Sequence, residues 1–144
     1  MKNIYKTALI VLVSIFGTLL FQGCATSNKG QIVSKEELHV EVTYLERKLL
    51  PPNAKVTLIL EDISKQDVKS KVLAKQSLVV KNAPPYTFTL SYDTNSIDFK
   101  HAYNLSAYIT VDGKYIYRSD AVFNPFSEIR EKYVIVLKRV PKED

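Results

Sequence analysis

The sequence predicts an all-β protein, an antiparallel immunoglobulin-like β-sandwich of about seven to eight strands that follows a signal peptide and a flexible tether. Short segments in which apolar and polar residues alternate recur along the chain, and turn-forming residues separate them. The composition agrees, because tyrosine is frequent (9 residues) whereas glycine (4) and proline (6) are few. The 144 residues suffice for one domain with a hydrophobic core.

The clearest element is a β-hairpin over residues 103–117. Apolar and polar residues alternate from Tyr103 to Val111, as in a strand that is covered on one face. Asp112-Gly113 supplies the two positive φ angles of a two-residue hairpin turn. The chain returns through residues 115–117 and is expected to continue to Phe123, with an irregularity near residues 119–120. A hairpin cannot bury its apolar face alone, so other strands must cover it.

The remaining strands follow from the same alternation. Pro51-Pro52 and Pro84-Pro85 break the chain between them, and residues 64–71 form a polar, lysine-rich connection. Residues 72–81 form one strand or a pair of short ones. Residues 133–137 are apolar at every position and predict a central strand that is buried on both faces. The other expected strands are residues 38–44, 56–60 and 86–92.

One tyrosine supports the choice of a sandwich. Tyr103 stands at the start of a strand, six residues after Ile97, which is the spacing of a tyrosine corner. In that arrangement the phenol bonds to the backbone upstream. The alternative is that Tyr103 is an ordinary core residue.

The first 23 residues have the three parts of an export signal. Lys2 and Lys6 precede an apolar run over residues 8–21, which is shorter than the ~20 residues of a membrane-spanning helix. Gly23 then precedes Cys24, the only cysteine, and this junction resembles the lipobox of bacterial lipoproteins. The resemblance implies cleavage between Gly23 and Cys24, a diacylglyceryl group on Cys24 and acylation of the new amine. The alternatives are an uncleaved signal anchor and a secreted protein whose cysteine has no role.

Several acyl chains on Cys24 would hold the protein stably on a membrane. Ala25 follows the cysteine where lipoproteins retained at the inner membrane commonly have aspartate, so the resemblance implies the periplasmic face of the outer membrane. A lone cysteine allows no intramolecular disulfide. The expected organisation is a signal peptide (1–23), the lipidated cysteine with its tether (24–36), the β-domain (37–140) and a polar tail (141–144).

The sequence offers little catalytic or metal-binding chemistry. His39 lies on the polar face of a strand and His101 in a loop, so both are expected to be solvated. Residues 93–98 have oxygen-bearing side chains at alternating positions but lack the glycine and glutamate of an EF-hand, so turn capping is preferred to calcium. We expect no catalytic residue, no metal, no cofactor beyond the lipid, no nucleic-acid partner and no small-molecule substrate.

A group of lysines allows two interpretations. The side chains either form a basic patch that faces phospholipid or another anionic surface, or they solubilise a loop and protect an edge strand from aggregation. The second interpretation is preferred. The lysines are Lys65, Lys69, Lys71, Lys75 and Lys81.

An ordered series of segments over about residues 40–124 resembles the YbaY/YscW family of bacterial lipoproteins. The segments are VTYLER (42–47), LPPNA (50–54), VTLILEDIS (56–64), YTFTLSYD (86–93), Ile97-Asp98, Tyr103 and ITVDGK (109–114). The resemblance implies a small β-sandwich on a lipid anchor. One branch of the family consists of type III secretion pilotins, chaperones that carry a secretin subunit to the outer membrane, and the other has no well-defined activity.

The predicted function is therefore an outer-membrane lipoprotein that binds a secretin subunit or another envelope protein. Binding would use an open strand edge or a groove that accepts an apolar helix, and the sequence does not say which strand. The alternative is a structural or stress-related envelope lipoprotein without a dedicated client. A cell-wall hydrolase is a remote third hypothesis, because no acid/base pair stands out.

Overall fold

The computed structural model describes residues 34–141. The predicted signal peptide, Gly23, Cys24 and most of the tether lie outside these residues. Within them no helix is long and apolar enough to cross a membrane. The described elements are β1 (Lys35–Tyr44), β2 (Lys55–Asp62), β3 (Lys71–Val79), β4 (Tyr86–Asp93), η1 (Thr94–Ser96), β5 (Tyr103–Val111), β6 (Lys114–Arg118) and β7 (Tyr133–Arg139).

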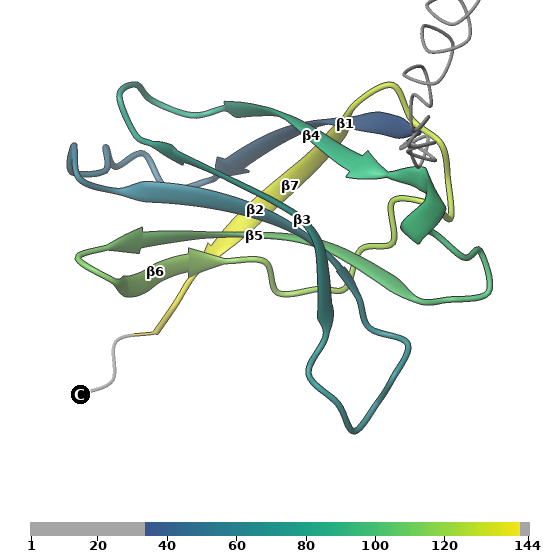
Figure 1. Cartoon of the computed structure of the whole chain (residues 1–144). Coiled ribbons are helices and arrows are strands. Elements are labelled where there is room, and N and C mark those ends of the chain that lie inside the picture. Colours follow the sequence, from purple (N-terminus) through teal and green to yellow (C-terminus); the bar gives the residue numbers. More distant parts are fainter. Residues whose placement is uncertain (1–33, 142–144) are drawn as a thin grey trace, which may run out of the picture. The chain divides into compact units, whose positions relative to one another are not determined.

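The seven strands form a single sheet in the order β3-β2-β5-β6-β7-β1-β4. This sheet curls into a nearly closed barrel, with β7 between β1 and the β5–β6 hairpin (Figure 1). The all-β prediction is confirmed, but the immunoglobulin-like sandwich is not. Alternating burial is common to sandwiches and barrels, so the pattern alone does not distinguish two packed sheets from one curled sheet.

One strand pair differs from an antiparallel fold. β1 and β7 run parallel, with Val40 opposite Tyr133 and Tyr44 opposite Leu137, while all other pairs are antiparallel. β1 also pairs with β4 without any shift in register. The N-terminal strand thus lies inside the sheet, between the C-terminal strand and β4.

The interior of the barrel is filled by the inward-facing residues of its strands. β4 shows the principle, because its residues are alternately buried and exposed from Tyr86 to Tyr92. Val40, Val56, Leu58, Leu105 and Ile109 are completely buried, so the core extends across β1, β2 and β5. Burial of a large aliphatic side chain stabilises the fold by roughly 1.5–3 kcal/mol.

The predicted hairpin is present as β5 and β6. Asp112 (φ 51°) and Gly113 (φ 78°) have the positive φ angles that a two-residue turn requires. The register shifts between Ile109 and Thr110, which marks a β-bulge. β6 ends at Arg118, but Leu105 still donates to the Phe123 carbonyl at 2.7 Å, so the following segment stays beside β5.

β7 differs from its prediction in one respect. It lies within the sheet, as expected of a central strand, but its outward valines are not buried. Val134 is 56% exposed and Val136 is 43% exposed. In a one-layer barrel the outer face meets solvent, so an apolar run does not require cover on both sides.

Candidate functional site

The barrel is open between β3 and β4, the two ends of the sheet, and we call this opening the seam. Within residues 34–141 no ladder joins these two strands, so each has one free edge. β3 carries Lys71 and Lys75 and contains a bulge beside Leu60, devices that discourage pairing with other strands. The exposed side chains of β4 are instead uncharged: Thr87, Thr89 and Ser91.

Two adjoining hollows lie at the seam, with volumes of about 480 and 600 Å³. They share Val79, Lys81, Asn82 and Ala83, and we call them together the seam groove. One hollow extends to Leu49, Leu50 and Pro52, and the other extends along β4 to Tyr86 and Thr87. Leu49 is 74% exposed and Val79 is 52% exposed, so large apolar side chains face solvent here. Apolar surface of this kind is typical of binding grooves.

Local turns hold the wall of the seam groove in place. Pro51-Pro52-Asn53 forms a turn before β2, in which the Ala54 amide donates to the Pro51 carbonyl at 2.9 Å. The Ala54 carbonyl accepts from the Val80 amide at 2.8 Å, which joins the turn to the end of β3. The Tyr44 hydroxyl donates to the Lys48 carbonyl at 2.8 Å. The loop that presents Leu49 is therefore anchored at both ends.

A buried hydroxyl lies beside the seam groove. The side chain of Tyr86 is 6% exposed, and its hydroxyl has no hydrogen-bond partner within the described part of the chain. Burial, with a smaller contribution from the neighbouring Tyr44 hydroxyl, raises the pKa of Tyr86 above its ordinary value. An unpaired buried hydroxyl costs about 1–3 kcal/mol. The groove is therefore not optimised for stability at this position.

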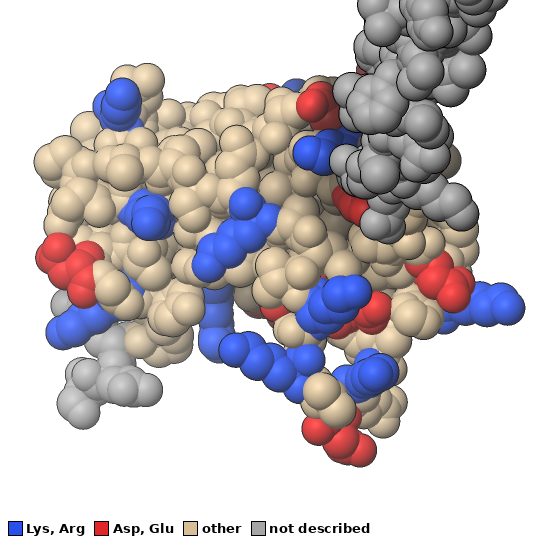
Figure 2. Space-filling model, in the orientation of Figure 1, with Lys and Arg blue, Asp and Glu red and all other residues tan. Residues whose placement is uncertain are grey.

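The face that carries β2 and β3 is mostly uncharged, with separate basic side chains on it (Figure 2). Lys65 and Lys69 lie on the projecting β2–β3 loop, Lys71 and Lys75 on β3, and Lys81 at the seam groove. All five lysines are exposed. Because they are distributed over a loop, an edge strand and the groove, they favour the solubilising role over one compact anionic site.

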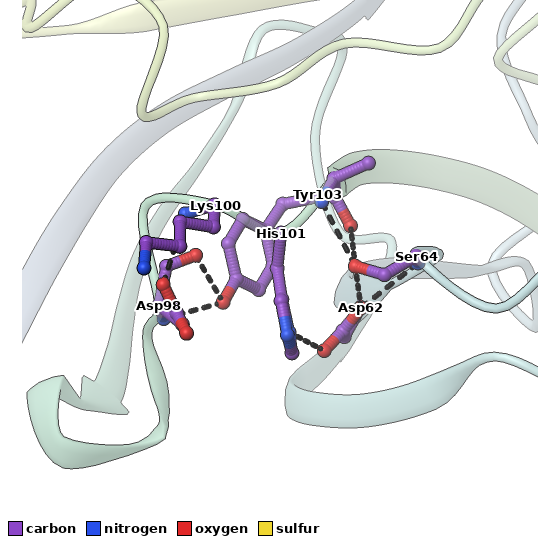
Figure 3. A network of polar contacts seen from close by, with 7 residues as sticks. Asp62, Ser64, Asp98, Lys100, His101 and Tyr103 are labelled. Atoms are coloured by element: carbon purple, nitrogen blue, oxygen red, sulfur yellow. Dashed lines mark hydrogen bonds and ion pairs between the residues drawn. The ribbon is translucent and has the colours of Figure 1, made fainter.

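Tyr103 forms the expected bond to the upstream backbone. Its hydroxyl accepts from the Asp98 amide at 2.7 Å and donates to the Asp98 carbonyl at 3.2 Å (Figure 3). The tyrosine corner is thus confirmed, although the surrounding fold is a barrel. The carboxylates of Asp93 and Asp98 accept from the amides of Asn95 and Lys100, as turn-capping residues do.

The two histidines differ in their surroundings. His39 is exposed, as expected, with Nδ1 3.5 Å from the Thr89 hydroxyl. His101 is also exposed, but its Nδ1 lies 2.8 Å from the Asp62 carboxylate at the end of β2. The Asp62 carboxylate also accepts from the hydroxyl and the amide of Ser64 (Figure 3). These bonds, with His101 as a smaller cause, lower the pKa of Asp62 to about 2.

This cluster joins two loops and does not form a nucleophile–base pair. Ser64 bonds to Asp62 rather than to His101, and its oxygen accepts from the Ala102 amide at 2.9 Å. A serine nucleophile would instead need the imidazole as its base. Among the described residues no group of three or more His, Cys, Asp or Glu side chains gathers as a metal site.

Comparison with known proteins places the chain in a family. Residues 33–135 match the family described as type III secretion system lipoprotein chaperone (YscW). The chain belongs to the YscW family. The match covers all seven strands of the barrel except the end of β7.

Two similar proteins agree with this family. The first is an uncharacterized lipoprotein YbaY of Escherichia coli K12, which is 35% identical over 78 residues. These residues are 54% of the present chain and 41% of the relative. The chain therefore spans less than half of that relative. The second is an alternative pilotin from the type II secretion system of Vibrio cholerae, solved as a structure. It is 32% identical, with a TM-score of 0.68 over 76% of this chain and 100% of that one.

The sequence did not reveal the seam groove. Leu49 and Val79 stand in segments that are not adjacent in the sequence, and the turn at Ala54 brings them together. The only available signal was the apolar pair Leu49-Leu50 directly before two prolines, where the alternating pattern of the strands is interrupted.

Proposed function

We propose that this protein is a pilotin-like chaperone that holds an apolar segment of a secretin subunit, or of another envelope protein, in the seam groove. The observation that carries the proposal is the exposed apolar surface of Leu49 and Val79 in the seam groove, which extends from the β1–β2 loop past the end of β3 to the start of β4. Membership of a chaperone family and likeness to a pilotin support it. The groove takes apolar side chains, and the uncharged edge of β4 offers main-chain groups to an extended segment.

We propose further that Cys24 carries the lipid and places the domain on the periplasmic face of the outer membrane. The lipoprotein family and the lipoprotein relative support this location. In this arrangement binding and delivery are separate properties. The barrel binds the client, and the acyl chains on Cys24 supply the affinity for the membrane.

A pull-down from detergent-solubilised envelopes tests both parts. Wild type and Cys24→Ala should recover the same client in similar amounts, but only wild type should bring it to the outer-membrane fraction. Leu49→Asp and Val79→Asp should reduce recovery about tenfold or more, because a carboxylate in an apolar contact costs more than 1.4 kcal/mol. Ile129→Asp is the matched control, since Ile129 is 94% exposed and does not line the groove.

The second candidate, a structural envelope lipoprotein without a client, is favoured by the likeness to an uncharacterized lipoprotein. Cells that express a secretion system distinguish the two candidates. If wild type recovers no stoichiometric partner from such cells, the pilotin-like function is wrong. Equal loss of recovery in the groove variants and in Ile129→Asp would show that the client binds elsewhere.

A further inference from the structure

A third hollow, of about 290 Å³, lies on the outer face of the β5–β6 hairpin. We call it the hairpin pocket. Its lining comes from β5, β6 and the residues after β6 and β7: Ser106, Ala107, Tyr108, Tyr115, Arg118, Ser119 and Val140. β5 and β6 are interior strands of the sheet, so this pocket does not belong to the seam between β3 and β4.

The base of the hairpin pocket is held by hydrogen bonds within the protein. The Ser119 hydroxyl accepts from the Ala107 amide at 2.8 Å and lies 3.0 Å from the Ala107 carbonyl. The Ser119 amide donates to the same carbonyl at 2.9 Å. At the rim, the Val140 amide donates to the Ile116 carbonyl at 3.0 Å. A ligand would therefore meet a preformed site and would not have to order it.

Two tyrosine rings form the apolar wall. Tyr108 and Tyr115 pack edge to face, with ring centroids 4.9 Å apart and an angle of 66° between the planes. Tyr115 is 57% exposed, so much of its ring meets water. An apolar side chain placed against these rings would bury surface that the protein now exposes to water.

Arg118 supplies a positive charge that the described residues do not neutralise. It lies opposite Tyr108 on β5, and its exposed side chain has no hydrogen bond or ion pair within residues 34–141. On its other side it lies opposite Lys138 of β7, and like charges at directly opposed positions destabilise a sheet. Lys138 is ion-paired with Asp120, which offsets its charge, so only the charge of Arg118 has no partner among the described side chains. A bound anion would pair with Arg118.

We propose that the hairpin pocket binds the C-terminal residue of a partner polypeptide when that residue has a large apolar side chain. The terminal carboxylate accepts two parallel hydrogen bonds from the Arg118 guanidinium, the geometry that this fork favours. The side chain lies against Tyr108 and Tyr115. The volume of about 290 Å³ suits one residue and is too small for a helix or a long acyl chain. This proposal does not rest on the chaperone function.

Fluorescence anisotropy with labelled tetrapeptides tests the proposal on the full chain in detergent micelles. The probes are Gly-Gly-Gly-Phe with a free carboxylate, the same peptide as its amide, and Gly-Gly-Gly-Gly with a free carboxylate. The free Phe peptide should bind saturably. The amide and the all-glycine peptide should each bind about tenfold more weakly or worse, since one removes the charge and the other the apolar contact. Micelles without protein correct for partitioning.

Two arginine variants give the matched comparison. Arg118→Gln should weaken the free Phe peptide about tenfold and leave the amide unchanged, while Arg118→Lys should restore little, because lysine lacks the fork. Arg47→Gln, at another exposed arginine without a partner in the described region, should bind like wild type. Circular dichroism and the urea midpoint verify that each variant is folded. No saturable binding by wild type, equal affinity for acid and amide, or equal loss in Arg47→Gln would each overturn the proposal.

Discussion

Removing the hydroxyl of Tyr103 is expected to lower the stability of the fold, whereas removing the hydroxyl of Tyr86 is not. Tyr103→Phe removes the group that bonds to both backbone atoms of Asp98, at 2.7 and 3.2 Å. The Asp98 amide then has no partner among the described residues, whereas the Asp98 carbonyl still accepts from the His101 amide at 2.8 Å. The ring still packs edge to face on Phe126, with centroids 5.1 Å apart. The loss is therefore limited to two hydrogen bonds, about 1–2 kcal/mol, since water reaches the exposed Asp98 in part. Tyr86→Phe removes a hydroxyl that has no partner among the described residues, so it should be neutral or stabilising by up to about 3 kcal/mol.

Urea unfolding followed by circular dichroism and tyrosine fluorescence measures both changes, and the protein has no tryptophan to interfere. With a slope near 2 kcal/mol per M, Tyr103→Phe should lower the midpoint by about 0.5–1 M, while Tyr86→Phe should leave it unchanged or raise it. The reasoning that hydrogen bonds determine these two stability changes is refuted if Tyr86→Phe is the more destabilising variant. It is also refuted if Tyr103→Phe unfolds at the wild-type midpoint.

Three further variants test other features of the barrel. Gly113→Ala should cost about 1–2 kcal/mol in chemical denaturation, entirely from its positive φ of 78°, because an added Cβ meets no atom within 4 Å; an unchanged midpoint would contradict this. Ser64→Ala should reduce the loss of stability between about pH 4 and pH 2 on a stability–pH curve. The Ser64 bonds lower the pKa of Asp62 to about 2, so the ionised carboxylate stabilises the folded state above about pH 4, and this stability is lost as the pH falls toward 2. Parallel acid limbs for wild type and Ser64→Ala would refute that role. Val136→Thr, on the exposed outer face, should change the thermal midpoint far less than Ile135→Thr, whose side chain faces the core at 7% exposure; similar losses would show that β7 is covered on both sides.

The strands were predictable where one face is buried and the other is exposed to solvent. In β4 and β5 every second side chain faces the core, so apolar and polar residues alternate visibly in the sequence. The hairpin turn was predictable because few residues other than those of Asp112-Gly113 accept two positive φ angles. β3 was uncertain because its residues are almost all partly exposed, so its pattern is weak.

The arrangement of the strands was not predictable from the same patterns. Val40 and Tyr133 pair although almost the whole sequence of the domain lies between them, and no local pattern identifies so distant a parallel partner. The choice of barrel over sandwich depends on that pairing, and so does the identity of the free edges at β3 and β4. The seam groove and the hairpin pocket follow from this topology. The predicted roles of Gly23 and Cys24 lie outside the described residues and stay predictions.

The parallel pairing of β7 with β1 also determines when the protein can fold during synthesis. Along the sheet, β7 alone connects the β1–β4 pair to the four strands β3, β2, β5 and β6. A nascent chain that still lacks residues 133–139 therefore has two separate sheet fragments and no closed core. β7, the last of the described strands to be synthesised, completes the barrel. A stop codon shortly before it would remove the connection between the two fragments and leave most of the described sequence intact.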